Sequence, residues 1–146
     1  MRLIQVAQRA VDLDRASAFY SRLLDSDPTG RFDPPGLLFF DLDGVRLLLD
    51  RGAPSSLIYL DVADLRLSVE ELRASGTKII QEPQLVYSHV DGSLGPAGTD
   101  EWMAFIKDSE GNTVGLVGRE ASGAGNRHSR RRARKNLAVE GPGRRC

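Results

Sequence analysis

The 146-residue chain is long enough for one compact domain, and its 40% hydrophobic and 27% charged residues are typical of a globular protein. No run approaches the ~18 apolar residues that a membrane span needs. The N-terminus turns polar too soon for a secretory leader, and the only cysteine, Cys146, excludes a disulfide framework and a cysteine-based metal site. We therefore expect a cytoplasmic protein without membrane contact.

The formal net charge of zero conceals two unlike segments. Residues 1–120 carry 12 Lys+Arg and 19 Asp+Glu, whereas residues 121–146 carry eight basic residues and one acid. This asymmetry predicts an acidic folded domain at 1–120 and a disordered Arg-rich tail at 121–146. The arginines within 127–135 predict at most weak contact with nucleic-acid phosphates, because no aromatic side chain is interspersed to stack on bases.

The first half of the chain begins with an apolar strand at 3–7, followed by a helix. Asp12 is a suitable N-cap, and the apolar residues between 13 and 24 recur at helical spacing. Residues 25–35 are rich in Pro and Gly and predict a connection. Two β-type runs follow at 37–41 and 45–49, and the Asp43-Gly44 pair between them is a strong hairpin signal.

The second half repeats this plan. A strand is predicted at 57–62 and a helix at 65–75 with Asp64 as its cap; a strand follows at about 78–81 and resumes at 86–90. A Gly-rich loop at 91–100 leads into a final hairpin of strands 102–107 and 113–117. Each half thus reads βαβββ, which predicts an α+β fold with modules at 1–52 and 57–118.

Two stretches carry a resemblance to a known family: Val11 to Leu24, and the closing EWMAFIKDSEGNTVGLV at 101–117. With the paired βαβββ modules, they resemble the vicinal oxygen chelate superfamily, which includes glyoxalase I, bleomycin-resistance proteins, extradiol dioxygenases and methylmalonyl-CoA epimerase. The resemblance implies a curled mixed sheet that forms a cup, and frequently a homodimer. It does not select one activity, since one scaffold hosts many chemistries.

In metal-using members of that superfamily, four side chains on the first and fourth strands of the two modules hold a divalent ion. The matching positions are Gln5, Leu47, Leu57 and Gly115. Only Gln5 offers an oxygen ligand, and Leu and Gly side chains have no lone pair. We therefore expect no metal of the usual kind and no other cofactor.

Without a metal, the cup is expected to be apolar with a few polar side chains. Alternation along the strands places Gln5 and Arg9 on one face, and Asp61 near the rim. The expected ligand-binding residues are Gln5, Arg9, Leu47, Leu57, Tyr59 and Trp102. These residues suit a small organic ligand, but ordinary core positions would show the same pattern, and Trp102 fits a core position better than a stacking wall.

His89 is the only histidine in residues 1–120, and it precedes the Gly-rich loop that Glu101 follows. If the two side chains meet, Glu101 would orient the imidazole for proton transfer. His89 and Glu101 are the candidate catalytic residues, although a loop histidine is often simply solvated.

Three functions remain open. The first is a metal-independent small-ligand binder of the bleomycin-resistance type, for which the acidic domain favours a cationic ligand. The second is a lyase or isomerase of the glyoxalase or epimerase kind that uses His89 and Glu101, with an atypical metal or none. The third is a nucleic-acid-associated role of the tail.

Overall fold

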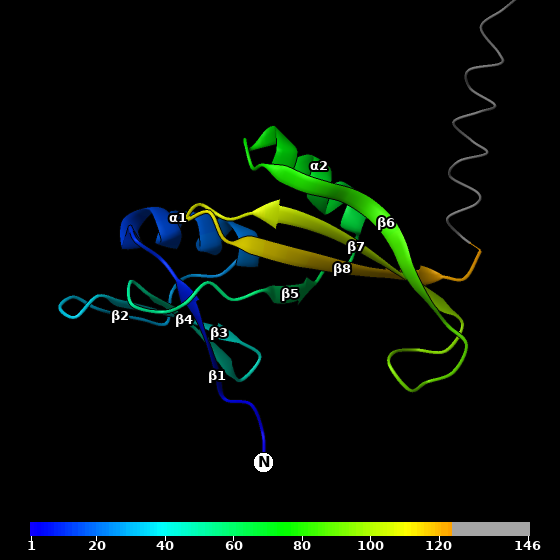
Figure 1. Ribbon diagram of the computed structural model, residues 1–146, viewed down its shortest axis with the longest axis horizontal. Helices are drawn as coiled ribbons and strands as arrows, with labels where there is room; N and C mark the ends of the chain where they lie inside the picture. Colours follow the sequence, from blue (N-terminus) through cyan, green and yellow to red (C-terminus); the bar gives the residue numbers. More distant parts are fainter. Residues whose placement is uncertain (124–146) are drawn as a thin grey trace, which may run out of the picture.

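The computed structural model describes residues 1–123. Two βαβββ units follow each other along this part of the chain (Figure 1). The elements are β1 (Gln5–Arg9), α1 (Leu13–Leu24), β2 (Gly30–Phe32), β3 (Leu37–Leu42), β4 (Val45–Asp50), β5 (Ile58–Asp61), α2 (Leu65–Ala74), β6 (Ile79–His89), β7 (Thr99–Lys107) and β8 (Thr113–Ala121).

Each unit forms its own four-stranded mixed sheet. The strand orders are β1-β4-β3-β2 and β5-β8-β7-β6, so the two sheets share one topology. In both, the first strand pairs in parallel with the fourth, and the remaining pairs are antiparallel. The α+β class and the repeated βαβββ order are therefore confirmed.

Both helices begin where the sequence predicts, because the cap interaction is local. Asp12 Oδ1 accepts from the backbone N–H of Arg15 at 3.0 Å, and Asp64 Oδ1 accepts from that of Leu67 at 3.0 Å. The predicted hairpin between β3 and β4 is also present. Its two central residues, Asp43 and Gly44, have φ angles of 52° and 86°, as such a turn requires.

Two strand predictions need correction. Residues 25–35 were expected to be a connection, yet they contain β2, which pairs with Leu37–Phe39 of β3. The break expected in β6 is absent, and the strand continues through Pro83 with local irregularities of register. Pro83 is tolerated because β6 is the edge strand of its sheet.

A single hydrophobic core joins the two units. The helix-facing side chains of both sheets and the buried faces of α1 and α2 belong to one cluster. At its border, the Tyr20 hydroxyl on α1 donates to Asp108 Oδ2 at 2.6 Å, in the β7–β8 turn. Asn112 Nδ2 donates to Asp108 Oδ2 at 2.8 Å and to the Arg9 carbonyl oxygen at 2.7 Å, so this turn also holds β1.

The β7–β8 turn makes a second contact with α1 through Glu110, whose side chain has no exposed surface. Glu110 Oε1 accepts from the backbone N–H of Asp12 at 2.7 Å, and Oε2 accepts from Arg15 Nε at 2.6 Å. These bonds satisfy free donors at the helix N-terminus. Burial opposes ionisation of Glu110, but the bonds outweigh it and lower the pKa of this carboxyl.

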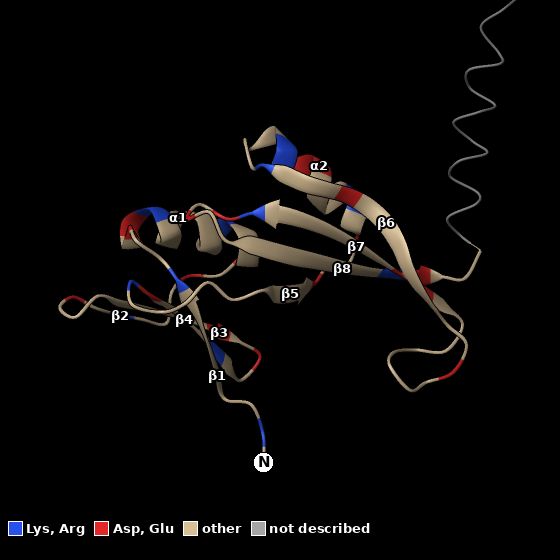
Figure 2. Ribbon diagram, in the orientation of Figure 1, with Lys and Arg blue, Asp and Glu red and all other residues tan. Residues whose placement is uncertain are grey.

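The side of each sheet that faces away from its helix is called the open face below. In the second sheet, α2 covers one side of β6, β7 and β8, and the open face lies on the other side (Figure 1). The central parts of β7 and β8 are largely uncharged, and charged residues gather toward the strand ends and the helices (Figure 2). Within residues 1–123, no helix is long and apolar enough to cross a membrane.

Candidate functional site on the open face of the second sheet

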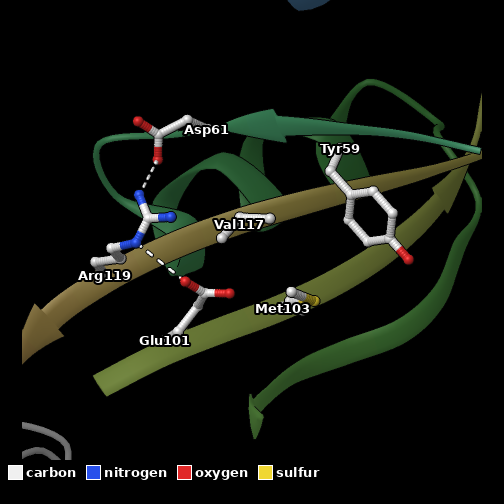
Figure 3. A pocket seen from close by; sticks show the side chains of 6 residues that line it. All are labelled: Tyr59, Asp61, Glu101, Met103, Val117 and Arg119. Carbon is white, nitrogen blue, oxygen red and sulfur yellow. Dashed lines mark hydrogen bonds and ion pairs between the residues drawn. The ribbon is translucent and has the colours of Figure 1, made fainter. Parts of the chain in front are cut away.

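The open face of the second sheet carries a hollow of ~320 Å³. Three strands supply its lining: β5 (Tyr59, Asp61), β7 (Glu101, Met103) and β8 (Val117, Arg119) (Figure 3). The alternation of side chains along each strand puts these residues on the same face. Tyr59 and Val117 with Met103 give an apolar floor, and the charged residues lie together at one end.

The charged side chains form a row across the sheet. Arg119 Nε donates to Glu101 Oε2 at 3.0 Å, and a second guanidinium nitrogen lies 3.7 Å from Asp61 Oδ1 (Figure 3). The same Glu101 oxygen lies 3.0 Å from His89 Nε2. Since a carboxylate only accepts, the imidazole N–H donates here. The structure thus brings His89 and Glu101 into the direct contact that the sequence analysis considered.

His89 is buried, with 3% of its surface exposed. Its ring packs edge-on against Tyr87, with the ring centroids 4.8 Å apart. The loop between β6 and β7 covers it: a Cβ at Gly95 would lie 2.7 Å from the imidazole. His89 Nδ1 has no hydrogen-bond partner among the described residues. Glu101 lines the hollow and His89 does not, so a ligand in the hollow would meet Glu101 first.

The other expected ligand-binding residues lie in or near the hollow, on the other sheet, or on the helix side of the second sheet. Leu57 and Tyr59 are each about half exposed, and Tyr59 lines the hollow. Gln5 and Arg9 lie on β1 in the other sheet and do not line it. Trp102 points to the helix side, where it packs against the core beneath the Arg66 guanidinium, which lies 4.6 Å from its ring centroid.

The expected position of Leu47 in the cup was wrong. Leu47 is fully buried in the core, and its register partner on β1 is Val6, whereas Gln5 pairs with Arg46. Because side chains alternate, Leu48 is on the opposite side of β4 from Leu47, toward the open face of the first sheet.

Gly115 has a structural reason to be glycine. It is the register partner of Tyr59, and a Cβ at this position would lie 2.6 Å from the Tyr59 ring. The ring also packs edge-on against Phe105, with centroids 6.0 Å apart. The aromatic side chain therefore occupies the space into which a longer side chain on β8 would extend.

The residues present do not fit the divalent metal that the resemblance implies. The four matching positions bring one amide, two leucines and a glycine that lies under a ring, a poor donor set for such an ion. Within residues 1–123, no group of three or more His, Cys, Asp or Glu side chains is placed to hold a metal ion.

Sequence reasoning missed two residues of the hollow, Met103 and Arg119. Met103 follows Glu101 by two residues and Arg119 follows Val117 by two, so period-2 alternation was the available signal. Arg119 lay beyond the predicted end of the last strand, but β8 continues to Ala121. The predicted nucleic-acid contact at 127–135 lies outside the described residues.

Comparisons with known proteins show the fold. No family model and no curated protein matches the chain. Solved structures do match, including a glyoxalase-related enzyme from Fulvimarina pelagi (15% identity, 80% of this chain and 87% of that one, TM-score 0.60). Lactoylglutathione lyase from Agrobacterium tumefaciens also matches (19% identity, 80% and 92%, TM-score 0.60), as does UcmS2 (21% identity, 80% and 97%, TM-score 0.62).

The chain has the glyoxalase/bleomycin-resistance fold. At these identities the likeness extends to the fold alone, because one fold hosts many activities.

Proposed function

We propose that this glyoxalase-like protein binds a small organic ligand in the hollow on its second sheet, without the divalent metal that many proteins of this fold use. The observation that carries the proposal is the composition of the hollow. Its apolar floor can bury a ligand body, and Glu101, Arg119 and Asp61 supply a few convergent polar groups that can orient it. We expect this binding in the cytoplasm.

A ligand screen tests the proposal. Thermal unfolding of the full chain, after treatment with a chelator, is followed with a library of small organic molecules. Met103→Trp fills the hollow and should abolish the stabilisation by any hit. Ile80→Trp adds the same bulk at an exposed position outside the lining and should retain it. Hits that stabilise both variants equally would exclude this hollow as their site.

We further propose that the functional unit is a homodimer. Leu57 and Tyr59, with Tyr87 of β6, are each about half exposed, so the open face exposes a considerable apolar surface. Covering them with a second copy would remove that surface from water and deepen the hollow. Sedimentation equilibrium tests this: a dimer is expected, and a monomer at all accessible concentrations would exclude it.

A lyase or isomerase of the glyoxalase or epimerase kind is the second candidate. The 3.0 Å contact between His89 Nε2 and Glu101 Oε2 favours it, because a carboxylate fixes the imidazole's orientation for proton transfer. Replacement of His89 by Ala separates the two candidates, provided that circular dichroism shows the fold retained. Turnover of a substrate found among the screening hits should collapse in the enzyme, whereas a pure binder should keep its affinity for the hit.

A further inference from the structure

We infer that the hollow selects an amphipathic cation: an amine or guanidine carried on an aromatic or alkyl body. This inference rests on the proposed ligand-binding function and names its ligand class. The hollow has a charged end and an apolar end. The charged end would bind the cationic group of such a molecule, and the apolar end would bind its aromatic or alkyl body.

The charged end has an excess of carboxylates. Two of them, Asp61 and Glu101, face one guanidinium, that of Arg119, which leaves a formal charge of −1 on the three side chains. The guanidinium lies between the carboxylates (Figure 3), so it already occupies the kind of position that a ligand cation would take. A carboxylate pair that holds one cation in this way also offers its remaining oxygen lone pairs to a second.

Both carboxylates have acceptor capacity left. Asp61 is 79% exposed, and its 3.7 Å separation from Arg119 is too long for a hydrogen bond. Glu101 uses one oxygen, Oε2, for both His89 and Arg119. Its other oxygen is turned toward the hollow (Figure 3). An ammonium group can therefore bind Asp61 or the second oxygen of Glu101 without breaking an existing hydrogen bond.

The apolar end is preformed. The Tyr59 ring is held against Gly115 and edge-on to Phe105. The residue is about half exposed and lines the hollow. Met103 and Val117 complete a surface on which an aromatic or alkyl body can lie. The ring face adds an attraction for a cation passing over it.

An anionic ligand is disfavoured by the same geometry. Arg119 is the only basic residue in the lining, and its guanidinium is already engaged by Glu101 and faces Asp61. An anion could bind Arg119 only next to these two carboxylates, and like charges at such short range repel.

Isothermal titration calorimetry of the full chain with three matched probes tests the inference: phenethylamine, 2-phenylethanol and 3-phenylpropionate. The amine should bind more tightly than the neutral alcohol, by up to about fivefold, the upper end of the range for an exposed ion pair, and the carboxylate should bind most weakly. Asp61→Asn should remove the preference for the amine. Asp27→Asn, the same change at an exposed site outside the hollow, should leave it intact.

The other possible results of these titrations separate the inference about charge from the proposed ligand-binding function. Equal binding of the amine and the alcohol would overturn the inference about charge and leave the proposed ligand-binding function standing. Preference for 3-phenylpropionate would overturn it in favour of Arg119 as an anion anchor. If none of the probes binds, the inference is overturned for this ligand class, and the library screen decides the proposed function separately.

Discussion

The Tyr20 hydroxyl donates to Asp108 Oδ2 at 2.6 Å, and this contact joins the helix of the first unit to the last hairpin of the second. Both residues are buried. Burial and the adjacent carboxylate raise the pKa of the Tyr20 phenol, so it is a hydrogen-bond donor at neutral pH. The two units of the fold are thus connected by a buried polar contact as well as by the shared core.

Tyr20→Phe should lower the free energy of unfolding by about 1–3 kcal/mol, because it leaves a buried carboxylate short of a donor. Urea unfolding measures this. Tyr87→Phe, which removes the same hydroxyl from a half-exposed ring, should change stability by less than about 0.5 kcal/mol. Equal effects of the two substitutions would exclude a special contribution of the contact.

Glu110 should make stability depend on pH in the acid range. Its pKa lies below the ordinary value of 4.5 in the folded protein, so the unfolded state binds the proton more readily. The contribution of Glu110 is fully present above 4.5 and is lost as the pH falls through the folded-state pKa. Glu110→Gln should cost about 1–3 kcal/mol near neutral pH.

The difference between wild type and Glu110→Gln should then shrink as the pH falls below 4.5. Urea unfolding at a series of pH values measures it. Glu71→Gln, at an exposed position on α2, should leave the pH profile unchanged. If the difference in unfolding free energy between wild type and Glu110→Gln stayed constant from neutral pH into the acid range, ionisation of Glu110 would not be its cause.

Gly95→Ala should increase the reactivity of His89. The added methyl group cannot coexist with the imidazole at 2.7 Å, so either the loop or the ring must move. Reaction with diethylpyrocarbonate, followed at the His89 peptide by mass spectrometry, should be slow in the wild type and faster in the variant. Gly92→Ala lies in the same loop with open space around it and should behave as wild type; a faster reaction there too would point to general loosening.

Gly115→Ala should destabilise the protein by about 1–3 kcal/mol, because the new methyl group overlaps the Tyr59 ring. In the Tyr59→Ala background this cost should largely disappear, since the ring is absent. A double-mutant cycle by urea unfolding measures the coupling. Additive effects would mean that Gly115 is required for a different reason.

The parts of the fold that depend on local chemistry could be predicted from the sequence. The Asp12 and Asp64 caps and the Asp43-Gly44 turn need only neighbours in the chain, and all three are observed. The strand β2, with three residues, is too short to show a period. The alternation of Leu47, Leu48 and Leu49 was hidden, because three identical side chains do not reveal which faces outward.

The candidate site was predictable only in part. His89 and Glu101 come together because β6 pairs with β7 across the loop that separates them in sequence. Trp102 lies between Glu101 and Met103 on β7, so alternation puts it on the helix side when those two face the hollow. Predicting that Arg119 lines the hollow would have required the full length of β8, which ends at Ala121.

Metal dependence of ligand binding tests the proposed function most directly. The full chain, treated with a chelator, is unfolded thermally with a screening hit, before and after nickel, zinc, manganese, iron or magnesium is added back. At ~100 times its Kd the hit should stabilise the protein by roughly 2.7 kcal/mol in every sample. A stabilisation that appears only with one metal bound stoichiometrically would contradict metal-independent binding.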